Sequence, residues 1–203
     1  SSNFVFCTLG YEMGTEKVTE KAEAFGINKT FDFDLPISKS QIQYKKMNDT
    51  DAALISIGQG QLLMTPLQVA MMGSAIANGG KIMRPYLVES ITSASGLTLG
   101  TTKPSVLYNA VSPGCAEYID SLMRGVVTNG TGSGSKISGV TVAGKTGTAE
   151  NESGKDHAWY VGYAPAENPK IAVAVLLEYD GNTGGGPAAS IAGRVMKKYL
   201  DMQ

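Results

Sequence analysis

A lysine between glycines is the feature of the sequence that most directly suggests chemistry. Gly144, Lys145, Thr146, Gly147 and Thr148 lie in a segment whose composition predicts a β-strand. Glycine weakens the interior of a strand and is found there mainly where another backbone or a ligand approaches closely. The spacing does not match the phosphate-binding loop, which requires Gly-x-x-x-x-Gly-Lys-Ser/Thr. The segment therefore indicates either a ligand-binding strand or an edge strand that carries one solvated lysine.

A second motif stands at the start of the chain. Ser1-Ser2-Asn3 has the form Ser-x-Asn and precedes an apolar segment, and Lys145-Thr146-Gly147 follows it. The two motifs occur in this order in penicillin-binding proteins and serine β-lactamases. Alone, either motif is a weak signal. Their meaning depends on the sequence between and around them.

That sequence resembles the transpeptidase domain of penicillin-binding proteins over almost the whole chain. The matching stretches are Ser56–Gly60, Thr65–Ala70, Ile76–Gly80, Val142–Glu150 and Ala158–Pro165. Gln59-Gly60 together with Thr65–Gln68 is more similar to the monofunctional class B enzymes than to the bifunctional ones. Two alternatives stay open: a relative of the class D β-lactamases, and a β-lactam sensor domain that is not an enzyme. Ala164-Pro165 favours a penicillin-binding protein.

The resemblance implies acyl transfer from D-Ala-D-Ala stem peptides. Such a reaction needs a nucleophile, a proton route to the leaving amine, and donors that face the developing oxyanion. By the family pattern, the Ser1 hydroxyl relays a proton toward the leaving group and the Asn3 amide holds the peptide backbone. Lys145 supplies positive charge to Ser1 and to the terminal carboxylate of the substrate. These three are the candidate catalytic residues.

The resemblance also implies a substrate-binding strand. The hydroxyls of Thr146 and Thr148 bind the terminal carboxylate, and the backbone N–H of Thr148 forms half of the oxyanion hole. Gly147 leaves room for the substrate to pair with the strand as an added β-strand. Thr146, Gly147 and Thr148 are therefore the candidate substrate-binding residues.

The nucleophile motif of the family, Ser-x-x-Lys, is expected before Ser-x-Asn and is not found there. The one match in the chain, Ser133-Gly134-Ser135-Lys136, lies between the other two motifs in a glycine-rich segment that predicts a flexible loop. The nucleophile must begin a helix so that the lysine one turn later faces its hydroxyl. We interpret this match as chance. Residues 1–203 are thus expected to be a partial transpeptidase domain that lacks the nucleophile and is inactive alone.

The strands that must position the second motif can be predicted locally. Three segments rich in valine, isoleucine, alanine and aromatic residues predict antiparallel neighbours, namely Val140–Ala149, His157–Ala164 and Lys170–Glu178. The apolar run of the third segment predicts a central strand covered on both faces. With helices before and after, the sequence predicts an α+β fold. The resemblance implies an antiparallel sheet flanked by helices, of the penicillin-binding and serine β-lactamase type, incomplete at its N-terminal side.

Helices are predicted from their caps. Asn3–Leu9 predicts the tail of a helix that begins earlier, and Thr15 caps a second helix that ends at Gly26. Thr65 and Pro66 begin another helix, with Gln68 reaching back to the cap. Residues 27–50 have no period and predict a long surface excursion.

Two later helices have predicted inner faces. The first begins at Ser112-Pro113 and ends near Asn129-Gly130, and its inner side is Ile119, Leu122, Met123 and Val126. The second closes the chain, with Ile191, Val195 and Tyr199 as its buried stripe. Outside the motifs, we interpret His157 as a solvated strand start and Trp159 as a core residue. Gly184–Gly186 is interpreted as a flexible connection, with a mobile lip of the cleft as the alternative.

Composition excludes several classes of function. The chain has 203 residues, 42% of them hydrophobic, and a formal net charge of −1, which provides no long-range field for nucleic acid. The longest apolar run, Ile171–Leu177, is far shorter than the about 20 residues that a membrane-spanning helix needs. Two cysteines and one histidine cannot form a disulfide framework or a zinc cluster. No metal, cofactor, nucleic acid or membrane contact is expected for this segment.

The resemblance implies the partners and the location. Peptidoglycan stem peptides are the expected substrates, β-lactam antibiotics the expected acylating inhibitors, and other cell-wall synthesis proteins possible partners. The expected location is the outer face of the bacterial cytoplasmic membrane, with an anchor in a segment that this chain lacks.

Overall fold

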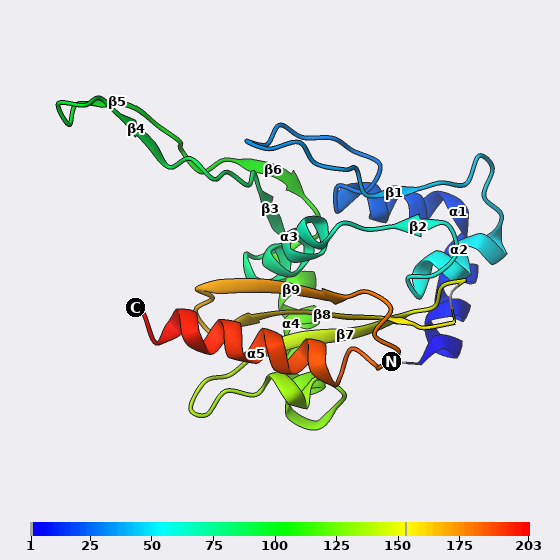
Figure 1. The fold of residues 1–203 in the computed structure, drawn as a ribbon. Helices are drawn as coiled ribbons and strands as arrows, with labels where there is room; N and C mark the ends of the chain where they lie inside the picture. The colour runs from blue at the N-terminus through cyan, green and yellow to red at the C-terminus, as the bar shows by residue number, and fades with distance from the viewer. Residues whose placement is uncertain (1, 153) are drawn as a thin grey trace.

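A computed structural model of the protein describes residues 2–152 and 154–203 and has a three-stranded antiparallel sheet at its centre (Figure 1). The strands are β7 (Ala143–Ala149), β8 (His157–Ala164) and β9 (Ile171–Leu177), in the order β7-β8-β9. The predicted strands and their antiparallel pairing are confirmed. The central position predicted for the third strand is wrong, because β8 is central and β9 has one described neighbour.

Helices cover both faces of the sheet, as alternation along β8 shows. Ala158, Tyr160 and Ala164 pack with α5 (Pro187–Leu200) in one buried cluster. Tyr163 packs on the other face with residues of α3 (Pro66–Ala77) and α4 (Pro113–Asn129). Successive side chains of a strand point to opposite faces, so these two clusters lie on opposite sides of one sheet. The predicted α+β architecture with flanking helices is confirmed.

The N-terminal helix differs from its prediction. α1 (Asn3–Ala24) begins with Ser2 as its N-cap, whose hydroxyl accepts from the backbone N–H of Val5. Because Ser2 has an extended backbone, α1 is not the tail of an earlier helix, and that prediction is wrong. Gly14 has a φ of 75° inside α1, so the helical backbone is interrupted just before the predicted cap Thr15.

Residues 27–50 form the predicted excursion over most of their length, but the last of them begin a helix. Asn48 and Asp51 form a capping box at the start of α2 (Asp49–Ser56), a helix the sequence analysis missed. The excursion also contains β1 (Gln41–Ile42), which pairs with β2 (Leu62–Leu63). Ile55 of α2 packs with Val18 of α1 in a small buried cluster. The segment therefore ends in an element that packs on α1.

The prediction for the start of α3 is confirmed for the cap and the first residue and is wrong for the side chain of Gln68. Thr65 caps α3 and accepts from the N–H of Gln68, and Pro66 is the first helical residue. The Gln68 side chain does not return to the cap. It is buried, and its Nε2 donates to the backbone oxygen of Phe25 at 2.6 Å. A buried side-chain amide needs a hydrogen-bond partner. The backbone oxygen of Phe25 at the end of α1 is such a partner, whereas the N-terminus of α3 is already capped by Thr65.

The inner faces of α4 and α5 are shifted from the predicted ones. In α4, Met123 is buried as predicted but Leu122 is 53% exposed. In α5, Val195 and Tyr199 are 45% and 37% exposed, so the predicted buried stripe is wrong. The small side of α5 faces inward instead, and its buried residues are Ala188, Ala189, Ala192, Gly193 and Met196. Small residues let the helix approach closely: a Cβ on Gly193 would lie 2.9 Å from the Cα of Ser135.

A two-stranded hairpin, also missed, projects from the body of the fold (Figure 1). Its base is β3 (Lys81–Met83) paired with β6 (Val106–Asn109), and its outer part is β4 (Ser90–Thr92) paired with β5 (Thr98–Thr101). Every residue of β4 and β5 is exposed. Among the residues that the structure describes, no helix is long and apolar enough to cross a membrane.

Candidate active site

The lysine of the glycine-flanked motif is held in the middle of β7. Lys145 pairs with Val161 of β8, and its side chain is half-buried. Its Nζ donates to the backbone oxygen of Thr146 at 2.7 Å. Burial lowers the pKa of the Lys145 ammonium below its usual value. The structure therefore holds a partly desolvated cation on the strand, where its attraction for an anion is stronger than in water.

A cavity of about 530 Å³ lies beside this strand. One wall is the strand itself, from Lys145 to Ala149, and the neighbouring part of β8 with Trp159. Another wall is the connection between α2 and α3, where the residues from Ile57 to Met64 other than Gln61 line the cavity. All four predicted residues of the strand, Lys145, Thr146, Gly147 and Thr148, line this one cavity. β7 is an edge strand of the described sheet, as the alternative interpretation held, but Lys145 is half-buried on a cavity wall and is not merely a solvated lysine.

The hydroxyls on the strand have different surroundings. Thr146 Oγ1 lies 2.8 Å from Thr131 Oγ1, which comes from the segment after α4. Thr148 is exposed. Gly147 pairs with Trp159, and a Cβ on Gly147 would lie 3.2 Å from the Trp159 Cβ. The strand thus presents two hydroxyls, one before and one after Gly147. The hydroxyl of Thr146 is hydrogen-bonded to another side chain, and Thr148 is exposed.

The strand is fixed from the side of α5 by a buried tyrosine. Tyr160 of β8 is fully buried, and its hydroxyl lies 2.6 Å from Ser135 Oγ. A Cβ on Gly144 would overlap the Tyr160 hydroxyl, so only glycine fits there. Burial raises the pKa of Tyr160 to about 12, although the hydrogen bond with Ser135 acts in the opposite direction. The first glycine of the motif therefore serves packing within the sheet.

This tyrosine predicts how stability depends on alkaline pH. The folded pKa of about 12 lies above the ordinary value of 10.0, so the stabilisation is complete below pH 10 and is lost between pH 10 and 12. Two pKa units correspond to roughly 2–3 kcal/mol. Denaturant titrations from pH 9 to 12 should show this loss in the wild type and a smaller loss in Tyr160→Phe. Tyr118→Phe is the matched control, because Tyr118 on α4 is 66% exposed; an unchanged pH slope in Tyr160→Phe would contradict the prediction.

The N-terminal motif is described only in part. Ser1 lies outside the described residues, so its predicted role is not tested. Asn3 is the first residue of α1 and is exposed, and it does not line the cavity beside β7 in the described part of the chain. Figure 1 draws the N-terminal end of α1 at the end of the sheet where β7 finishes. The role predicted for Asn3 stays a prediction.

The rejected Ser-x-x-Lys match is not built as a nucleophile. Ser133–Ser135 forms a single 3₁₀ turn, η1, and Lys136 follows it as an exposed residue. Ser135 is the buried member, and its Oγ donates to the oxygen of Gly132 at 2.8 Å. The segment is a packed turn and not the loop that was predicted. No α-helix begins at Ser133, which agrees with the interpretation as a chance match.

Three neighbouring interpretations need correction. Trp159 is partly exposed and lines the cavity, so it is not a core residue. His157 does begin a strand, but its Nδ1 accepts from the N–H of Tyr179 at 3.0 Å. Gly184 is buried, and a Cβ there would overlap the backbone oxygens of Trp159 and Gly147. The glycine turn before α5 is therefore packed on β7 and β8, and neither of its predicted flexible roles describes it.

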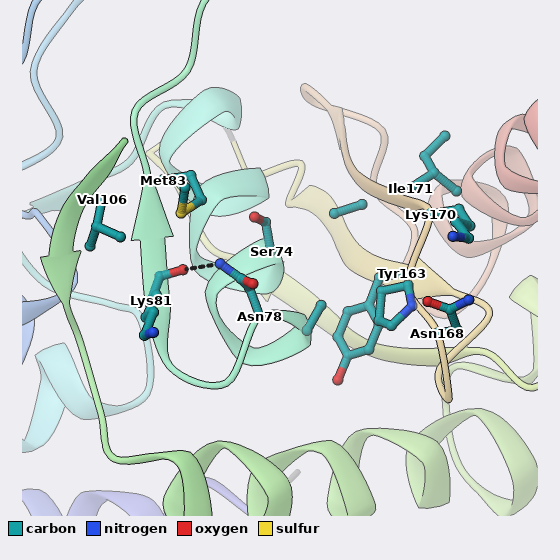
Figure 2. A pocket seen from close by; sticks show the side chains of 12 residues that line it. Ser74, Asn78, Lys81, Met83, Val106, Tyr163, Asn168, Lys170 and Ile171 are labelled. Carbon is teal, nitrogen blue, oxygen red and sulfur yellow. Dashed lines mark hydrogen bonds between the residues drawn. The ribbon is translucent and has the colours of Figure 1, made fainter. Parts of the chain in front are cut away.

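A second, larger cavity of about 660 Å³ lies at the other end of the sheet (Figure 2). It is bounded by the end of α3 at Asn78, by Lys81 of β3, and by Lys170 in the connection between β8 and β9. Tyr163 borders it and donates from its hydroxyl to Asp120 Oδ1 at 2.7 Å. None of the candidate residues on β7 lines this cavity. The chemistry is thus associated with the smaller cavity, because only that one contains the motif.

Comparisons with known proteins agree on one family. The family model described as "Penicillin binding protein transpeptidase domain" matches residues 1–197. The chain is 41% identical to the peptidoglycan D,D-transpeptidase PbpA of Mycolicibacterium smegmatis, over 94% of this chain and 40% of that protein. It is 37% identical to PbpA of Mycobacterium tuberculosis, over 98% of this chain and 42% of that protein. The chain thus spans about 40% of the length of these relatives.

Solved structures give the same result for the fold. The D,D-transpeptidase domain of a peptidoglycan glycosyltransferase from Eggerthella lenta superposes with a TM-score of 0.90 at 39% identity, covering 100% of this chain and 51% of that one. An imipenem acyl-enzyme complex of penicillin-binding protein A from M. tuberculosis has a TM-score of 0.90 at 36% identity. That match covers 98% of this chain and 45% of the other. The fold predicted from the resemblance is confirmed.

Proposed function

Because the chain belongs to the family of penicillin-binding protein transpeptidase domains, we propose that the protein containing it is a peptidoglycan D,D-transpeptidase of class B. Its donor substrates are D-Ala-D-Ala stem peptides, and β-lactams acylate it in their place. The observation that carries the proposal is the cavity beside β7, which Lys145, Thr146, Gly147 and Thr148 line together.

The proposed reaction has two steps. A serine hydroxyl attacks the carbonyl carbon between the two D-alanines, the C–N bond breaks, and D-alanine leaves with the proton. An amine of a second stem peptide then attacks the ester and releases the serine. The nucleophile of this proposal is a Ser-x-x-Lys serine in a part of the protein outside this chain, since Ser133 is unsuited to the role.

The residues of β7 have defined tasks in this proposal. The half-buried ammonium of Lys145 attracts the terminal carboxylate of the donor peptide, and the hydroxyls of Thr146 and Thr148 donate to it. The N–H of Thr148 stabilises the oxyanion. Ser1 relays the proton to the leaving amine, Asn3 holds the peptide backbone, and the backbone at Gly147 pairs with the substrate.

The proposal extends to location and partners. The enzyme works on the outer face of the bacterial cytoplasmic membrane, held by an anchor outside this chain, and together with other cell-wall synthesis proteins. In support, the relatives named above are peptidoglycan transpeptidases by name, and one solved relative is an imipenem acyl-enzyme.

The test is covalent labelling of the full-length protein with a fluorescent penicillin. We expect a label that survives denaturation and is released slowly, together with cross-linked product from a stem-peptide donor and acceptor. Rapid release of the label by water would instead identify a β-lactamase. A stable label without any cross-linked product would identify a sensor. Absence of labelling in the folded full-length protein would refute all three.

A further inference from the structure

The contact between Thr146 and Thr131 joins the candidate site to a segment that has no role in the function proposed above. Their Oγ1 atoms are 2.8 Å apart, although the residues are separated by 15 positions in the chain. Thr131 follows α4, in the short segment that leads into η1. Thr146 lies on the cavity wall, so Thr131 reaches the site through the Thr146 side chain.

The segment that carries Thr131 is held in place by close packing. A Cβ on Gly185 would overlap the backbone oxygen of Thr131, so the turn before α5 lies directly against that peptide. A Cβ on Gly132 would lie 3.1 Å from a side-chain carbon of Val126 in α4. Four positions after Thr131, Ser135 is fully buried and is hydrogen-bonded to Tyr160 of β8. Thr131 is thus fixed relative to the sheet by contacts on both of its sides.

The number of protons on the two hydroxyls decides which threonine donates in this hydrogen bond when a carboxylate is bound. Each threonine hydroxyl has one proton to donate and two lone pairs that accept. To bind a carboxylate, Thr146 must donate its proton toward the cavity. The contact with Thr131 is compatible with that only if Thr131 donates and Thr146 accepts. A donated hydrogen bond would both hold the Thr146 hydroxyl in one orientation and make its own proton a better donor.

We propose that Thr131 is a positioning residue for carboxylate recognition, which it promotes by orienting the hydroxyl of Thr146. This inference rests on the function proposed above, because it needs a substrate with a terminal carboxylate. Thr131 itself needs no contact with the substrate.

The experiment compares Thr131→Val with Thr131→Ser in the full-length protein. The measured quantity is the second-order rate constant of acylation by benzylpenicillin and by its methyl ester, which lacks the carboxylate. For Thr131→Val we expect a decrease of about fivefold to tenfold with benzylpenicillin, the usual effect of one hydrogen bond. With the methyl ester we expect almost no decrease. Thr131→Ser retains the hydroxyl and should remain close to the wild type with both compounds.

A double-mutant cycle makes the test specific for Thr146. If Thr131 acts through Thr146, the variant Thr131→Val/Thr146→Val should be no slower with benzylpenicillin than Thr146→Val alone. Thr128→Val is the control for a threonine lost from the same region, since Thr128 Oγ1 only donates to the oxygen of Arg124 within α4.

Each outcome has one meaning. Equal losses with benzylpenicillin and its methyl ester, additive effects in the cycle, or failure of Thr131→Ser to restore the rate would each overturn the inference. So would an unchanged rate in Thr131→Val. A wild type that benzylpenicillin does not acylate would refute the proposed function instead.

Discussion

Replacing Lys145 with alanine is expected to slow acylation of the full-length protein by benzylpenicillin by about 10²–10³-fold, the usual effect of removing one preorganised electrostatic group. The ammonium is half-buried on β7, where burial lowers its pKa and water screens it less than at the surface. Alanine leaves the strand pairing intact, because Lys145 pairs with Val161 through its backbone. The measurement is the rate of labelling by a fluorescent penicillin.

The control for this variant is Lys136→Ala. Lys136 is the exposed lysine of the rejected Ser-x-x-Lys match and should label at the wild-type rate. Thermal unfolding of both variants is measured in parallel, and both should unfold near the wild type. If Lys145→Ala lost stability in proportion to its activity, Lys145 would be a structural residue and the role proposed for it would be wrong.

The second large effect is expected for Gly184→Ala, which should lower the free energy of unfolding by about 3 kcal/mol, at the upper end of what overpacking costs. A Cβ there would overlap the backbone oxygens of Trp159 and Gly147, and backbone atoms cannot rotate away as a side chain can. The turn or the two strands must shift. Because Gly147 is on the cavity wall, acylation should become slower as well. Denaturant titration measures the first effect and penicillin labelling the second.

Gly125→Ala provides the matched comparison. Gly125 lies within α4, and a Cβ there would meet no atom within 4 Å. Alanine in an open helical position should raise the free energy of unfolding by up to about 1 kcal/mol. A Gly184→Ala variant as stable as the wild type would mean that the turn is free to move, as the sequence analysis supposed.

The elements whose signals lie within a few consecutive residues of the sequence were predictable. Thr65 and Ser112 cap α3 and α4 as expected, since a cap requires only a hydroxyl and the next three residues. The three strands were found from their composition and their short connections. The capping box at Asn48 is equally local, and the absence of an apolar period in α2 is what concealed it.

The choice of helix face was less predictable, because periodicity identifies a stripe and not its partner. In α5 the row of large residues that ends in Val195 and Tyr199 lies next to a row of alanines. Hydrophobicity favours the first row, whereas close contact with Ser135 and the sheet requires the second. The predicted position of β9 was wrong for a similar reason. An apolar run indicates two covered faces, which α3 and α5 provide, and does not indicate a central place in the sheet.

The residues of the candidate site also fall into those that the sequence predicts and those that it does not. Lys145, Thr146, Gly147 and Thr148 are consecutive on one strand, so spacing and resemblance were sufficient to find them. Thr131 could not be found, because nothing local marks a threonine whose partner is on another element. In the connection between α2 and α3, only Ser56–Gly60 was quoted, for its resemblance alone, and no signal in the connection indicated that it lines the cavity beside β7.

The projecting hairpin of β4 and β5 has a practical consequence for studying the protein. Its tip, residues 93–96, closes a ribbon that is exposed along both strands, and no described residue of the ribbon lines the cavity beside β7. Exposed tips of this kind are where chains accept inserted sequence with least disturbance. A peptide tag or a fluorophore introduced there would report on the location and turnover of the protein in growing cells, and it should leave the acylation proposed for the cavity beside β7 unaltered.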